Sequence, residues 1–232
     1  MNIALLLSGG TGTRLGADIP KQYLGVSGKP VISYSLERLS CHSKIDTIWI
    51  VAEAMWQKQI MKWLPEYDPR HKCRGFSLPG ANRQLSILHG LEDMKAYAGE
   101  SDYVLIHDAA RPLLSEELIT NCLEALHGHD GVLPVLPMKD TIYASRDGKM
   151  ITSLLDRSCL FAGQAPEGFC FGKYYEANRR LGAEEILKIN GSTEPAVMAG
   201  MDIVMIPGDE NNFKITTTED LERFRGWLQG KL

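Results

Sequence analysis

The sequence lacks several features that would each mark a particular class of protein. No apolar run approaches the roughly 20 residues that cross a bilayer. The net charge of −4 leaves no basic excess of the kind that nucleic-acid-binding proteins carry. Residues 1–7 lead straight into a glycine-rich loop, without the basic segment or small-residue cleavage site of a secretory signal. We therefore expect a cytoplasmic protein with neither a membrane nor a nucleic-acid partner.

Cysteine is scarce as well. The five cysteines form neither a C-x-x-C pair nor a zinc-type spacing. They are Cys41, Cys73, Cys122, Cys159 and Cys170. We expect free thiols, some of them packed as small hydrophobic side chains.

Strand-like and helix-like segments alternate along the 232 residues. Apolar runs predict buried strands, and apolar residues at helical spacing or favourable first turns predict helices. The strands are expected at 3–7, 45–52, 103–106 and 131–136, and the helices at 31–40, 54–64, 82–97, after Ser115 and at 217–228. This alternation predicts a single α/β domain with a mainly parallel sheet and helices on both faces.

Residues 141–155 interrupt the alternation. Asp147-Gly148 is a favoured two-residue turn, here between the short strands Thr141–Ser145 and Met150–Leu154. An isolated hairpin is marginal in water and needs a surface to pack on. The hairpin can fold back on its own domain or extend to a second subunit, and the sequence leaves both options open.

A glycine-rich loop, residues 7–16, follows the first expected strand. Backbone N–H groups at such a position can approach phosphates. The loop lacks the G-K-[ST] ending of a Walker loop, and three residues separate Gly12 from Gly16, which breaks the dinucleotide spacing. A nucleotidyltransferase loop, with Arg14 and Lys21 directed at a triphosphate, is the third interpretation. A turn with two solvated cations is the simpler alternative.

Two further segments have the residue types of a nucleotide site. Residues 80–86 form a glycine turn before a helix, which could surround a flat base or merely cap the helix. Asp108 follows a strand, where a nucleotide and its Mg²⁺ would lie. Arg111 could pair with a phosphate or hold its own loop through a carboxylate. Lys214 precedes a helix-capping pattern, and its role depends on its neighbours.

Taken together, these motifs carry a resemblance to a known family. They follow one another in a single order from residue 7 to residue 221: GGTGTRLG, PKQYL, GANRQLS, HDAARP, Asp140-Thr141, Leu155-Asp156-Arg157, Gln164-Ala165-Pro166 and NNFKITTTEDL. The chain resembles the methylerythritol-phosphate cytidylyltransferases and their relatives, the ribitol-phosphate and ribulose-phosphate cytidylyltransferases. The resemblance implies a Rossmann-like nucleotidyltransferase domain with a β-arm, residues 141–163, exchanged across a homodimer.

The resemblance also implies roles for individual residues. Arg14, Lys21 and Lys214 would stabilise charge on the triphosphate of CTP while a polyol phosphate attacks and pyrophosphate leaves. Mg²⁺ would bridge the phosphates, with Asp108 as its candidate ligand. The nucleotide-binding residues would be Leu7, Ser8, Gly9, Gly10, Thr11, Gly12, Gly80, Ala81, Asn82, Arg83, Ser86, Asp108 and Ala109. The acceptor-binding residues would be Arg111, Asp140, Thr141 and Arg157.

Two segments depart from the family pattern. Ala165-Pro166-Glu167 stands where Thr-Pro-Gln is common, and Glu194-Pro195 stands where relatives often have paired acids. The acceptor therefore stays open between methylerythritol phosphate, which would indicate isoprenoid biosynthesis, and a pentitol phosphate, which would indicate teichoic acid or capsule biosynthesis. The alternatives are a nucleotidyltransferase for another NTP or sugar phosphate and a non-catalytic nucleotide-binding homologue.

Overall fold

A mainly parallel sheet forms the centre of the computed structural model, which describes residues 1–10 and 19–230. The strand order is β10-β7-β11-β6-β1-β4-β5, and β12 also pairs with β7. Among the described strands of this sheet, only β10 and β11 run antiparallel to their neighbours. The strands are β1 (Asn2–Leu7), β4 (Thr47–Val51), β5 (Cys73–Ser77), β6 (Tyr103–Asp108), β7 (Gly131–Pro137), β10 (Phe161–Gly163), β11 (Glu167–Cys170) and β12 (Ile203–Pro207).

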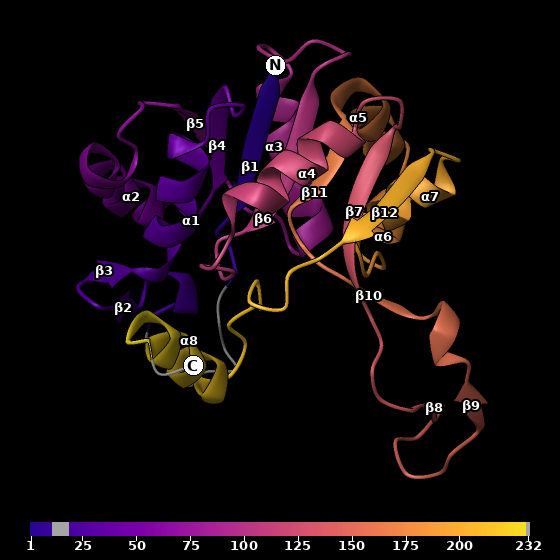
Figure 1. The fold of residues 1–232 in the computed structure, drawn as a ribbon. Helices are drawn as coiled ribbons and strands as arrows, with labels where there is room; N and C mark the ends of the chain where they lie inside the picture. The colour runs from indigo at the N-terminus through magenta and orange to yellow at the C-terminus, as the bar shows by residue number, and fades with distance from the viewer. Residues whose placement is uncertain (11–18, 231–232) are drawn as a thin grey trace.

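Helices cover both faces of this sheet, as the alternation of elements predicts (Figure 1). Adjacent residues of β1 point to opposite faces, so Leu6 packs in one cluster with Leu36 and Leu118, and Leu5 in another with Leu91 and Tyr174. The helices are α1 (Val31–Cys41), α2 (Ala54–Tyr67), α3 (Arg83–Met94), α4 (Glu116–Ala125), α5 (Phe171–Arg179), α6 (Ala183–Ile186), α7 (Glu194–Met198) and α8 (Thr218–Leu228). All five cysteines are free.

Two local predictions are wrong for identifiable reasons. The helix predicted at 54–64, just before Pro65, continues to Tyr67, because the Asp68 N–H bonds the Leu64 carbonyl at 2.8 Å and closes the last turn beyond the proline. The sequence predicts Thr216 and Glu219 as the cap of α8, but the cap is Thr217 with Asp220, since Asp220 also accepts from the Thr216 hydroxyl.

The hairpin forms an arm that projects away from the sheet (Figure 1). Its strands are β8 (Ile142–Ala144) and β9 (Ser153–Leu155), which pair antiparallel. The expected two-residue turn is wrong: residues 145–152 form a longer loop, in which the Asp147 carboxylate accepts from the Lys149 and Met150 N–H groups. Large apolar side chains of the arm face solvent, with Met150 70% and Ile151 65% exposed.

Candidate active site

A cleft of about 400 Å³ opens where β1 and β6 end. Ligands of open α/β sheets sit at this edge, beyond the carboxyl ends of the parallel strands. Among the described residues the cleft is lined by Leu7, Gly9, Gly10, Lys21, Gln22, Glu53, Gly80, Ala81, Asn82, Arg83, Ser86, Asp108, Ala110, Lys214 and Thr216.

Most of the predicted nucleotide site is therefore assembled in one place. Lys21 and Lys214, which are 193 positions apart in the sequence, line the same cleft as both glycine turns. Ser8 and Ala109 are buried next to lining residues. Thr11, Gly12 and Arg14 lie outside the described residues.

Two side chains that the sequence left without a role support the first glycine turn. The Gln22 amide donates to the carbonyls of Ser8 and Gly10, at 2.7 Å each. The Tyr23 hydroxyl donates to the Ser8 carbonyl at 2.8 Å, and its ring stacks on Trp56 with centroids 3.9 Å apart. Burial raises the pKa of Tyr23 to about 12, so the hydroxyl stays a donor. Both residues belong to the PKQY segment, in which only Lys21 was assigned a role.

The second glycine turn is held by side chains of the helix that follows it. The Ser86 hydroxyl accepts from the Gly80 N–H at 2.9 Å and donates to the Asn82 carbonyl at 2.8 Å. Asn82 caps α3 by accepting from the Leu85 N–H, and its amide donates to the Ile186 carbonyl. A Cβ on Gly80 would lie 2.5 Å from the side chain of Leu85, so this turn requires glycine. The helix cap and the cleft wall are thus the same structure, and the two interpretations of residues 80–86 are compatible.

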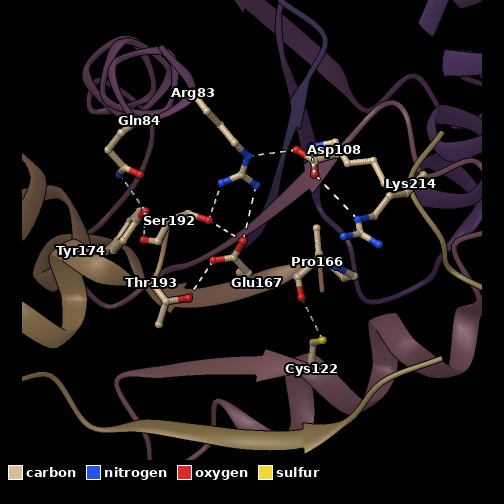
Figure 2. Close-up of polar contacts among 12 residues, drawn as sticks. Arg83, Gln84, Asp108, Cys122, Pro166, Glu167, Tyr174, Ser192, Thr193 and Lys214 are labelled. Atoms are coloured by element: carbon tan, nitrogen blue, oxygen red, sulfur yellow. Dashed lines mark hydrogen bonds and ion pairs between the residues drawn. The ribbon is translucent and has the colours of Figure 1, made fainter. Parts of the chain in front are cut away.

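Asp108 is the electrostatic centre of the cleft (Figure 2). Its Oδ1 accepts from Nε of Arg83 at 3.1 Å, and its Oδ2 accepts from Nζ of Lys214 at 2.9 Å. Nε of Arg111 is 3.8 Å from Oδ2. Burial alone would raise the pKa of Asp108, but Arg83 and Lys214 outweigh it and hold that pKa well below its usual range. Asp108 is therefore a permanent anion among three cations.

Arg83 links Asp108 to a second buried carboxylate, Glu167 (Figure 2). The terminal nitrogens of Arg83 contact Glu167, at 3.4 Å, and the Ser192 hydroxyl. Glu167 also accepts from the hydroxyls of Ser192 and of Thr193, the latter at 2.9 Å. The sequence marked Glu167 only as a departure from the family pattern. The structure shows that its charge is matched by Arg83 and that its oxygens are hydrogen-bonded.

Arg111 lies behind the cleft wall and not on it. Its guanidinium donates to the Asn212 carbonyl at 2.6 Å, and its own carbonyl contacts Nε2 of His107 at 3.1 Å. Complete burial lowers the pKa of His107 to about 4, so this histidine is neutral at physiological pH. Of the two roles considered for Arg111, holding its loop is the one that these contacts match.

The other predicted acceptor residues lie away from the cleft, at the base of the arm. Asp140 and Thr141 are exposed, and Arg157, in the short helix η3 (Arg157–Cys159), donates to the Lys139 carbonyl at 2.7 Å. A single chain therefore does not bring these three residues into its own cleft.

Comparison with known proteins agrees with this geometry. The sequence model of the 2-C-methyl-D-erythritol 4-phosphate cytidylyltransferase family matches residues 2–229. The chain belongs to this family. It is 34% identical to the enzyme of that name from Geobacter metallireducens, over 99% of this chain and 98% of the relative. It is also 28% identical to a ribitol-5-phosphate cytidylyltransferase from Lacticaseibacillus paracasei, over 100% and 99% of the two chains.

The fold comparison points to the same family. A solved 4-diphosphocytidyl-2C-methyl-D-erythritol synthase from Anaerococcus prevotii superposes with a TM-score of 0.81, at 26% identity over 98% of this chain and 96% of that one. The chain is thus a CTP-dependent nucleotidyltransferase of the cytidylyltransferase family. Within the described residues, no helix has the length and apolar character needed to cross a membrane.

Proposed function

We propose that this chain transfers CMP from CTP to a small polyol phosphate, either 2-C-methyl-D-erythritol 4-phosphate or a pentitol phosphate such as ribitol 5-phosphate. The observation that carries the proposal is the convergence of Lys21, Lys214 and two glycine turns on one cleft. Backbone N–H groups and ammonium groups together suit a triphosphate, and the small turn residues leave room for a base.

In the proposed reaction the protein positions the reactants and neutralises charge. An oxygen of the acceptor phosphate forms a bond to the α-phosphorus of CTP, and the bond from that phosphorus to the β-phosphate oxygen breaks. Pyrophosphate leaves with the bonding electron pair. Lys21, Lys214 and Arg14 would stabilise the charge that develops on the triphosphate oxygens.

Mg²⁺ would accompany the triphosphate and add further neutralisation of its charge. The described residues contain no cluster of three or more His, Cys, Asp or Glu side chains that could hold a metal ion. Asp108, the candidate ligand, already faces Arg83, Lys214 and Arg111, and these cations disfavour a dication on the same carboxylate. We therefore propose that Asp108 anchors the cationic groups and does not ligate Mg²⁺, which would enter with the triphosphate.

The acceptor half of the site would be completed by a second copy of the chain. The solvent-facing apolar side chains of the arm need a covering surface, which a homodimer would provide. An exchanged arm would carry Arg157 to the partner's cleft, where its guanidinium could bind the acceptor phosphate.

The acceptor is tested by pyrophosphate release. The purified protein is given CTP and Mg²⁺ with methylerythritol, ribitol, ribulose or glycerol phosphate in turn. We expect release with methylerythritol phosphate or a pentitol phosphate. No release with any member of the panel would contradict the proposed function.

A separate prediction concerns the base. CTP is expected to exceed UTP and ATP by at least roughly tenfold in kcat/KM, because a site that hydrogen-bonds one base edge leaves buried polar groups unpaired with another. Steady-state kinetics with the three nucleotides measures this ratio. Equal use of CTP and UTP would show that the turn at Gly80 does not recognise the cytosine edge.

A further inference from the structure

Arg111 has a buried N–H donor that is not used in hydrogen bonding among the described residues. Its Nε makes no hydrogen bond to any described residue. Burial lowers the pKa of Arg111, and the nearby carboxylate of Asp108 opposes this shift only in part. Oδ2 of Asp108 lies 3.8 Å from this Nε, which is too far for a hydrogen bond.

Nζ of Lys214 donates a hydrogen bond to that oxygen, at 2.9 Å. The Lys214 side chain is 35% exposed and lines the cleft, whereas the Arg111 side chain is 13% exposed and does not. An incoming triphosphate would therefore meet Lys214, and Arg111 would stay behind the wall.

The two cations are also mechanically connected. Arg111 donates to the carbonyl of Asn212, two residues before Lys214, so a movement of this segment acts on both. Arg83 holds the other oxygen of Asp108. The carboxylate is thus fixed on one side, and only Oδ2 can change its partner.

We propose that Arg111 is a positioning residue that replaces Lys214 on Oδ2 of Asp108 when Lys214 turns to the triphosphate. The inference rests on the proposed contact between Lys214 and CTP. Departure of Lys214 would leave a buried carboxylate oxygen unpaired, which is unfavourable. Arg111 prevents this by closing the gap from 3.8 Å to the roughly 2.9 Å of a charge-assisted hydrogen bond. It acts without touching the nucleotide.

The first test observes the Nε–H proton of Arg111 by NMR in the wild-type protein, with the resonance assigned from an Arg111→Lys sample. Adding CTP and Mg²⁺ without acceptor should shift the proton downfield and slow its exchange with water at least about tenfold, the effect of one charge-assisted hydrogen bond. CMP, which has no β- or γ-phosphate, should leave it unchanged. The Arg83 Nε–H is an internal control, because it already bonds Asp108.

The second test removes Lys214, which competes with Arg111 for Oδ2 of Asp108. In Lys214→Ala, Arg111 should show the bonded signal without any nucleotide. An unchanged Arg111 resonance in this variant would overturn the inference. A different result is also informative: Arg111 could be hydrogen-bonded in Lys214→Ala while the wild type does not respond to CTP. This would contradict the contact between Lys214 and the triphosphate, and Lys214 would then have no reason to leave Asp108.

The third test measures binding. Arg111→Lys keeps the charge but cannot bond Asn212 and Asp108 together, so the dissociation constant of CTP should rise about tenfold. Affinity for CMP should stay the same, because CMP would leave Lys214 in place. Equal weakening of both nucleotides would indicate a merely structural role for Arg111 and contradict the exchange.

Discussion

Lys214→Ala is expected to lower kcat by about two orders of magnitude, the usual loss when a transition-state charge donor is removed. Lys21→Ala and Arg14→Ala should have effects of the same size. The side chain of Lys214 is partly exposed and contacts Asp108 from the open side of the cleft, so the variant should fold. Single-turnover pyrophosphate release separates this loss in chemistry from a loss in CTP binding.

The matched control is Lys173→Ala. Lys173 is also an ion-paired lysine, but neither it nor its partner Asp130 lines the cleft, and the Lys173 side chain is exposed. Exposed pairs contribute little to stability, so this variant should keep wild-type turnover. Near-wild-type turnover of Lys214→Ala, Lys21→Ala and Arg14→Ala would mean that the triphosphate binds elsewhere.

Mixing two inactive variants is expected to restore activity. If the arm crosses to the partner, a dimer of one Arg157→Ala chain and one Lys214→Ala chain contains one intact composite site. Random exchange of equal amounts makes half of the dimers mixed, so about one quarter of the wild-type sites should reappear. Turnover is measured after subunit exchange, which mass spectrometry of isotopically labelled chains can verify.

The control for this experiment is a mixture of Lys214→Ala with Lys21→Ala. Both substitutions damage the part of the site that one chain supplies. No mixed dimer then holds an intact site, and activity should stay at the level of the parents. If the Arg157 and Lys214 mixture behaves in the same way despite proven exchange, the two residues act in the same chain's site or not at all.

The sequence predicted the site best where the residues of a motif directly follow a strand or begin a helix. The apolar run before the first glycine turn and the strand before Asp108 predicted the two strand ends that meet at the cleft. Of the predicted glycine segments, Gly9, Gly10 and Gly80 line that cleft. The helix at Ser115 also formed as predicted, since Ser115 accepts from the Leu118 N–H.

Contacts between distant segments could not be predicted in the same way. Nothing local to Glu167 indicates that Ser192, Thr193 and Arg83 converge on it, because they come from two other parts of the chain. The antiparallel strand β11 was missed for a related reason. Its segment Glu167–Cys170 has no apolar alternation, and its place between β6 and β7 depends on contacts with distant parts of the chain.

The exposed apolar arm has a consequence for how the chain must be produced. Unless another surface covers it, a newly made chain displays Met150, Ile151 and a two-stranded edge to every neighbouring polypeptide. Such segments promote self-association, and charged residues beside them oppose it. Here Arg146, Asp147 and Lys149 lie at the tip and would act as gatekeepers during synthesis. The charges at the tip would then protect the chain against aggregation, in addition to any part that the tip has in the proposed dimer.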